Sequence, residues 1–385
     1  MKRFSFQCLS GHQRRTSVPP ESHPVSSVCQ SNASGTGKDS GGTTSLRKGV
    51  CIRAVLFTFL AASSSSFAVE EKTAEELITP KTQTAITKGL RFLAGRQIDS
   101  GRDKGAFGAT SYAGSVGIAG LAGLALMADG NTPGVGKYGK QVENAVGFLV
   151  RNTNNSGYIA KTGNEVGNMY CHGFAMLFMT QAAGMSMNKD LDDKVRQSIN
   201  LLVAAQNNQG GWRYRPVKSD ADLSVTVCQI MALRAARDAG FHVPDKTREQ
   251  CIDYVKKSQA KNGSFSYTMG RGGGSFPLTA SGVVSLYSAG IYDDPMIELG
   301  LKFLDGNAMG STSHYYYYGN YYAVQAMWHA GGQRWNTWYP RLRDELLSKQ
   351  GGDGSWSSSY GPEYGTAMAL IILQMPKEQI PVFAR

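Results

Sequence analysis

The sequence predicts an all-α fold, an α/α toroid of about six helical hairpins. First, a motif of Gln, three residues, Gly, one residue and an aromatic residue occurs at 206–212 (QNNQGGW), 259–265 (QAKNGSF) and 350–356 (QGGDGSW). A weaker copy is expected at 152–158 (NTNNSGY), and Gln97 stands at the matching place after the first helix. Second, successive copies from Gln97 to Gln259 are 55, 54 and 53 residues apart. Third, each interval holds two apolar helical segments, and since one hairpin cannot bury its own apolar face, this indicates a helical repeat.

The first helix of each hairpin keeps a polar face and is expected on the outside of the ring. These outer helices are predicted at 82–96, 140–151, 190–205, 246–258, 295–304 and 335–349. The second helix is more uniformly apolar and rich in small residues, as in GIAGLAGLALMA, and is expected on the inside. The inner helices are predicted at 112–128, 170–183, 223–239, 279–289, 316–330 and 363–374. Left-handed glycines are expected to end several of them, at Gly184, Gly240, Gly290 and Gly331.

The composition indicates a globular protein with a large core, because 41% of the 385 residues are hydrophobic and 18% are charged. The net charge of +11 is uneven: residues 1–68 contribute +6 and the rest +5. The remainder has no stripe of Lys and Arg and no nucleic-acid-binding motif, so no nucleic-acid partner is expected. Of three cysteines in the body, Cys228 and Cys251 are predicted to be buried apolar thiols.

The N-terminal region predicts export. Residues 1–49 are expected to be a disordered leader or an over-extended gene start. Residues 50–68 have a basic residue, a short apolar segment and small residues before a cleavage point after Ala68, which describes a signal peptide. The apolar segment is too short for a stable membrane span, which needs ~20 residues. We therefore expect a bacterial protein, periplasmic or extracellular, whose toroid domain occupies 75–385.

The motif resembles the repeat of the terpenoid cyclase and protein prenyltransferase superfamily (the prenyltransferase and squalene oxidase repeat), which carries a Gln, Gly and Trp signature like those at 206–212 and 350–356. The resemblance covers about residues 80–375. It implies a squalene-cyclase-like toroid that holds its substrate in a central cavity, with chemistry near the N-terminal ends of some inner helices. The signature itself is predicted to be structural, because Gln can both donate and accept hydrogen bonds at helix ends.

Two acidic residues precede the third predicted inner helix, and the resemblance suggests two roles for them. Squalene-type cyclases protonate an alkene with Asp-x-Asp-Asp followed by Thr; Asp220 and Asp222 match the first two positions, whereas Leu223 and Ser224 occupy the others. Two close carboxylates raise the pKa of one of them, which can then act as an acid. Protein prenyltransferases bind zinc through Asp-x-Cys and a His, but Ser224 replaces the Cys and 274–282 contains no His. We expect no metal or cofactor. The alternative role for Asp222 is to cap the helix.

Other polar and aromatic residues cluster where inner helices begin, and these ends converge on one mouth of the ring. The expected ligand-binding residues are His172, His314, Tyr315, Tyr318, Tyr322, Glu363 and Tyr364. Tyrosine suits a cavity because its ring is apolar and its tip polar, but the run at 314–322 also suits a helix or subunit interface. Cys171 and His172 have the chemistry of a metal ligand or a nucleophile with its base, yet adjacent helical residues point about 100° apart, which favours a buried pair.

Three functions are compatible with these residues. The favoured one is an exported toroid that binds an isoprenoid or another large apolar ligand, with Asp222 and Asp220 as candidate acids for catalysis. The second is an exported α/α-barrel enzyme acting on polysaccharides, in which Tyr and His serve as acid and base. The third is a non-catalytic scaffold that binds a protein partner at one face of the ring. Fold alone cannot decide among them, because one scaffold hosts unrelated functions.

Overall fold

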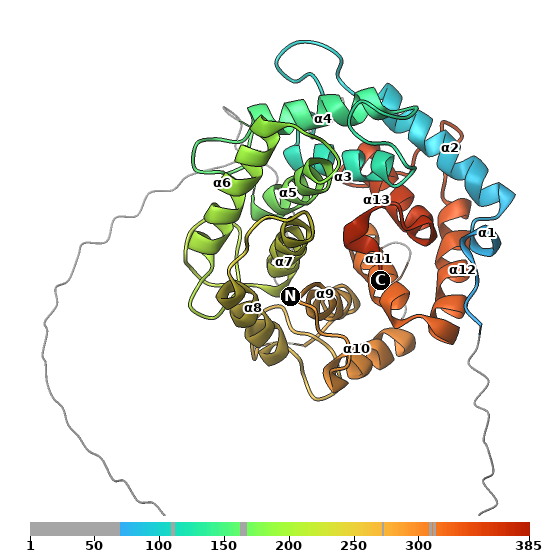
Figure 1. The fold of residues 1–385 in the computed structure, drawn as a ribbon. Coiled ribbons are helices and arrows are strands. Elements are labelled where there is room, and N and C mark those ends of the chain that lie inside the picture. The colour runs from blue at the N-terminus through green and yellow to red at the C-terminus, as the bar shows by residue number, and fades with distance from the viewer. Residues whose placement is uncertain (1–69, 109–111, 162–167, 272, 308–309, 311–312) are drawn as a thin grey trace, which may run out of the picture. The chain divides into compact units, whose positions relative to one another are not determined.

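In the computed structural model, twelve long helices form a ring of two concentric layers (Figure 1). The structure describes residues 70–385 except 109–111, 162–167, 272, 308–309 and 311–312, so the predictions for residues 1–68 lie outside the described residues. The outer helices are α2 (Pro80–Gly95), α4 (Gly139–Arg151), α6 (Lys189–Ala205), α8 (Asp245–Lys257), α10 (Pro295–Gly306) and α12 (Gly332–Ser348). The inner helices are α3 (Val116–Met127), α5 (Met169–Ala183), α7 (Leu223–Asp238), α9 (Phe276–Ser288), α11 (Tyr316–Ala330) and α13 (Pro362–Gln374). A short helix α1 (Ala74–Leu77) precedes the ring, and two 3-10 turns, η1 (Met375–Lys377) and η2 (Pro381–Phe383), follow it.

All twelve predicted helices are present, and the all-α toroid is confirmed. The largest difference in bounds is at α3, which begins four residues later than predicted because the Ser115 side chain caps it, accepting from the Ile118 N–H at 3.4 Å. The left-handed glycine was wrong at Gly184, whose φ is −64°. Its N–H donates to the Thr180 carbonyl at 3.1 Å, so the helical turn continues there. The other three predicted glycines have positive φ.

The two layers differ in burial as the prediction required. Every residue of α3 and α5 is buried, whereas an outer helix such as α6 buries residues only at helical spacing along one face. Small residues bring the inner helices close together: a Cβ added to Gly120 of α3 would lie 2.6 Å from the Phe174 carbonyl oxygen of α5. Among the described helices, none has both the length and the apolarity needed to cross a bilayer.

Four glutamines, Gln97, Gln206, Gln259 and Gln350, each tie one outer helix to the next, which is the structural role predicted for the motif. The Gln206 side-chain amide donates to the Gly210 carbonyl in its own loop and to the Thr247 carbonyl of α8, both at 2.9 Å. Gln350 donates in the same way to the Ala85 carbonyl of α2, also at 2.9 Å. Because α12 is thereby joined to α2, the last hairpin contacts the first and the ring is closed.

The weak motif copy lies one residue later than predicted. Thr153 and Ile159 form the isolated β-bridge that closes this loop, and Gly157 has the positive φ (86°) of the motif glycine. The copy is therefore 153–159 rather than 152–158. Thr153 occupies the Gln position, and its hydroxyl donates to the Leu149 carbonyl of its own helix at 2.8 Å. The side chain is too short to make the tie that glutamine makes elsewhere.

The C-terminal residues turn back into the ring, where Figure 1 shows the C-terminus. The Val382 N–H donates to the Gln181 side-chain oxygen of α5 at 3.3 Å. The Phe383 ring packs edge-to-face against Tyr321 of α11, with 6.1 Å between centroids. The residues of η2 thus fill space between inner helices at the end of the ring where α5 and α11 finish.

The beginning and the end of the described chain are held together. Arg385 donates to the Glu71 carboxylate at 2.8 Å, and its guanidinium stacks 3.6 Å from the Trp328 ring centroid. The Lys72 N–H donates to the Asn336 side chain of α12 at 2.9 Å. The segment before α1 therefore packs beside the last hairpin.

Candidate functional site

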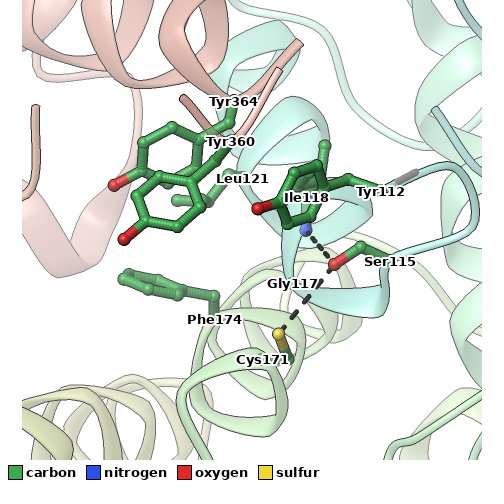
Figure 2. Close-up of a pocket in the computed structure, with 9 residues that line it drawn as sticks. All are labelled: Tyr112, Ser115, Gly117, Ile118, Leu121, Cys171, Phe174, Tyr360 and Tyr364. Carbon is green, nitrogen blue, oxygen red and sulfur yellow. Dashed lines mark hydrogen bonds between the residues drawn. The ribbon is translucent and has the colours of Figure 1, made fainter. Parts of the chain in front are cut away.

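A small pocket lies where the N-terminal ends of α3 and α5 meet the start of α13 (Figure 2). Its lining residues are Tyr112, Ser115, Gly117, Ile118, Leu121, Cys171, Phe174, Tyr360 and Tyr364. Figure 2 shows the rings of Phe174, Tyr360 and Tyr364 gathered on one side and that of Tyr112 beside Ile118. The free space inside it is about 20 Å³, which is room for about one water molecule.

The aromatic rings of the pocket hold one another in place. Tyr360 lies edge-to-face against Tyr112 and Tyr364, with centroid distances of 5.9 and 5.2 Å. Edge-to-face contact is a favoured arrangement of aromatic pairs. The exposed His314 side chain lies at the rim, where its Nε2 is 2.6 Å from the Tyr360 hydroxyl and its Nδ1 is 3.4 Å from the Ser359 hydroxyl. Of the predicted ligand-binding residues, Tyr364 lines the pocket and His314 positions a residue that does.

Asp222 is fully buried at the start of α7, at the centre of a hydrogen-bond network. Its Oδ1 accepts from the Val225 N–H at 2.9 Å, which is the predicted N-cap, and from the Ser224 hydroxyl at 2.7 Å. Its Oδ2 accepts from the Tyr267 hydroxyl at 3.2 Å. The Ser224 hydroxyl lies 2.5 Å from that of Tyr170, which belongs to α5 and directly precedes a pocket residue. The carboxyl is thus connected through the Ser224 and Tyr170 hydroxyls to α5, the helix that contributes Cys171 and Phe174 to the pocket.

Burial raises the pKa of Asp222 to about 6, while hydrogen bonds from Ser224 and Val225 act in the opposite direction. This differs from the prediction that a second carboxylate would raise it. The Asp220 side chain is 66% exposed and pairs with Arg213. The Arg213 Nε is also 3.7 Å from Asp222 Oδ2, so the guanidinium lies near both acids. Asp220 is therefore a solvent-facing ion-pair partner, and Asp222 alone has the environment of an acid.

The predicted ligand-binding tyrosines in and just before α11 divide into two groups. The Tyr318 hydroxyl donates to the Ser224 carbonyl at 2.9 Å, and the Tyr322 hydroxyl lies 3.2 Å from the Cys228 sulfur, so both reach α7. Burial raises the pKa of the Cys228 thiol to about 12 and keeps it neutral, as predicted for a buried apolar thiol. Tyr315 instead packs against His314 at the rim, with 5.1 Å between centroids.

His172 and Glu363, both predicted to bind ligand, have structural partners instead. The His172 Nδ1 accepts from the Ile159 N–H at 3.2 Å, the place taken by threonine hydroxyls in the other repeats, and burial lowers the pKa of His172 to about 3. Its neighbour Cys171 lines the pocket, so the pair diverges as predicted. Glu363 is buried and accepts from Arg96 at 2.8 Å, which joins α13 to the end of α2.

Sequence reasoning missed three residues around Asp222. Tyr214 and Tyr267 share a hydrogen bond between their hydroxyls, and the Arg213 guanidinium lies 5.2 and 5.6 Å from their ring centroids. A signal was available, since each tyrosine stands two residues after a motif aromatic, Trp212 or Phe265. Within the described ranges, no three His, Cys, Asp or Glu side chains converge as a metal site requires.

The raised pKa of Asp222 predicts how stability changes with pH. The folded state binds this proton more tightly than the unfolded state, in which the carboxyl has its ordinary pKa of 3.8. Wild type should therefore lose stability relative to Asp222→Asn as pH rises from about 4 to 7, by about 3 kcal/mol for a shift of about two units. Both proteins contain His172, whose opposite contribution below pH 6.5 cancels in the comparison. Urea unfolding at several pH values measures the difference, and parallel curves for the two proteins would contradict it.

No family model matches the sequence, and no curated protein does, but solved structures match its fold. Type II terpene cyclase MstE from Scytonema is 14% identical, with a TM-score of 0.55 over 78% of this chain and 100% of its own. A variant of it in complex with its substrate geranylgeranyl dihydroxybenzoate gives a TM-score of 0.53, at 14% identity over 78% and 98% of the two chains. An α-amylase from Clostridium perfringens is 12% identical, with a TM-score of 0.54 over 76% and 97%. The resemblance to the terpenoid cyclase toroid is confirmed at the level of the fold.

Proposed function

We propose that the aromatic pocket binds an isoprenoid or another large apolar ligand, and that Asp222 supplies the proton for an acid-initiated reaction of that ligand. The observation that carries the proposal is the environment of Asp222. It is buried, the pKa is raised to about 6, and Ser224 and Tyr170 connect it to α5, a wall of the pocket. The toroid shared with MstE, which acts on a geranylgeranyl compound, supports this choice of ligand.

The pocket wall favours an apolar ligand with electron-rich double bonds. The lining is made of tyrosine, phenylalanine and aliphatic side chains, and Ser115 uses its oxygen to cap α3. Aromatic faces stabilise a positive charge within ~6 Å through their quadrupoles. Binding of such a chain would require the aromatic rings of the pocket to move apart, because the free space between them is about 20 Å³.

The chemical step follows from the partners of Asp222. In the proposed step the Asp222 proton passes to the Ser224 hydroxyl, which passes its own to Tyr170, and the Tyr170 hydroxyl proton adds to one carbon of a double bond. The π pair forms the C–H bond, and the neighbouring carbon becomes a cation. The carboxylate left behind keeps the Ser224, Val225 and Tyr267 hydrogen bonds, which stabilise its charge. The cation later loses a proton, so the net reaction is an isomerisation or cyclisation and needs no co-reactant. At pH 7 a pKa of about 6 leaves roughly a tenth of the molecules protonated and ready to react.

A ligand panel tests the binding. Squalene, polyprenyl phosphates, and neutral and acidic glycans are added separately to the full chain, and thermal unfolding is recorded. A ligand at ~100 times its dissociation constant stabilises the fold by ~2.7 kcal/mol, a clear rise in Tm. We expect the rise with isoprenoids, and its loss in Ile118→Trp, which fills the pocket. Leu299→Trp is the matched control, because Leu299 is 42% exposed on the outer helix α10. Equal shifts in both variants, or none in wild type, would refute the pocket as the binding site.

One observation favours a second candidate, cleavage of a polysaccharide. The His314 imidazole and the Tyr360 phenol are 2.6 Å apart at the rim of the pocket, a pair able to exchange a proton, and the fold is shared with an α-amylase. In the same panel a rise in Tm with glycans, together with release of sugar ends that His314→Ala abolishes, would replace the isoprenoid proposal. If no ligand in the panel shifts the Tm and a protein co-purifies with the chain, the non-catalytic scaffold that binds a protein partner becomes the better-supported function.

A further inference from the structure

A second small pocket, with a free space of about 20 Å³, lies at the opposite end of α7 from Asp222. It is bounded by the last turns of α7 and α9 and the first turns of α8, which adjoin one another in Figure 1. Its floor is apolar, formed by Ile230, Leu233 and Val243, and three guanidinium groups border it, from Arg234, Arg237 and Arg248.

Helix capping accounts for only part of this cluster. Arg234 donates to the Tyr287 carbonyl at 2.8 Å and Arg248 to the Ala289 carbonyl at 3.1 Å, so each satisfies one carbonyl at the end of α9. A guanidinium has five N–H donors, so most of theirs stay available. The Arg248 Nε is buried and has no hydrogen-bond partner among the described residues.

The nearby acids do not neutralise the pocket. Asp238 pairs with Arg234 at 3.3 Å, and Asp245 stands 3.8 Å from Arg248, beyond hydrogen-bond distance, with 82% of its side chain exposed. Arg237 is exposed, and no ion pair to it is found within the described part of the chain. Three cations therefore face two carboxylates, which leaves the pocket with an excess positive charge.

We propose that this pocket binds an oxyanion carried on a small apolar group, such as a phosphate monoester. The guanidinium fork matches phosphate or carboxylate oxygens in pairs, and the bonds are strengthened by charge. The apolar floor would lie against the group that carries the anion. This site is separate from the one around Asp222 and does not depend on the function proposed for it.

Calorimetric titration of the full chain with phenyl phosphate tests the proposal, with inorganic phosphate and phenol as probes of the two halves of the ligand. We expect phenyl phosphate to bind more tightly than inorganic phosphate, and phenol to bind least. Arg237→Gln should weaken phenyl phosphate binding about tenfold or more, because it removes a charge-assisted hydrogen bond from a side chain that the fold does not use. An unchanged Tm of this variant confirms that it is folded.

Arg341→Gln is the matched control, since Arg341 is also an exposed helical arginine, on α12. Equal loss of binding in both variants, or no binding of phenyl phosphate at all, would overturn the proposal. Phosphatidylcholine vesicles containing phosphatidic acid identify the source of the anion. If phenyl phosphate reverses sedimentation with these vesicles, the ligand is a lipid headgroup; if phenyl phosphate binds and the vesicles do not, it is a soluble phosphate ester.

Discussion

Replacing Gly210 by Ala is expected to destabilise the ring by about 3 kcal/mol or more. Gly210 is the motif glycine after α6, with φ of 94°, where an L side chain is strained by ~1–2 kcal/mol. In addition, the new Cβ would lie 1.9 Å from the Gln250 carbonyl oxygen of α8, a backbone atom that cannot move alone. Overpacking of this kind costs a further ~1–3 kcal/mol.

Gly240→Ala separates these two contributions. Gly240 also has a positive φ, of 84°, but nothing lies within 4 Å of the position of its missing Cβ. We expect this variant to lose only the strain, ~1–2 kcal/mol. Urea unfolding of both variants beside wild type gives the comparison. If Gly210→Ala is no less stable than Gly240→Ala, the close approach of the motif loop to the next outer helix is wrong.

Replacing Asp222 by Asn should abolish turnover of an alkene substrate while leaving the protein folded. Removal of a general acid costs ~10²–10⁴-fold in rate, because nothing else at the site carries a comparable proton. The helix keeps its cap, since Asn serves that position as well as Asp. Product formation from squalene or a geranylgeranyl compound, followed by mass spectrometry, measures the loss.

Asp220→Asn is the matched control for this experiment. It makes the same chemical change two residues away, in a side chain that is 66% exposed and paired with Arg213. We expect turnover within about twofold of wild type, on the order of the small effect of an exposed ion pair. Equal rates for wild type and Asp222→Asn would remove Asp222 from the reaction. A collapse of both variants would instead favour the paired carboxylates that the sequence suggested.

The layers of the fold were predictable because they depend on local pattern. The all-buried α5 and the one-sided α6 differ in hydrophobic period, which can be read from the sequence alone. The predictions were wrong where a residue of a different chemical type occupies a position of the repeat. Thr153 takes the Gln position through its backbone, and His172 accepts the backbone bond that Thr226 accepts in the next repeat. Because Thr does not resemble Gln and His does not resemble Thr, comparing the repeats by residue type could not identify either position.

The candidate site was harder to predict because it is assembled from residues far apart in the chain. Asp222 was singled out by its motif, but the cause of its raised pKa is burial, and its partners Tyr267 and Tyr170 come from the hairpins on either side. The pocket likewise joins Tyr112 to Tyr360, from opposite ends of the chain. Contacts of this kind follow from the closure of the ring, and hydrophobic period carries no information about them.

The contacts of Arg385 with Glu71, and of Gln350 with α2, have a consequence for topology. The same kind of glutamine tie joins four of the neighbouring pairs of outer helices, including the pair that links the last hairpin to the first. The starting point of the chain is then arbitrary with respect to the architecture. A short linker from residue 385 to residue 70 would let the polypeptide be reopened in another surface loop, as a circular permutant with the same neighbours. Duplication of one hairpin, followed by closure, is the simplest history for such a ring.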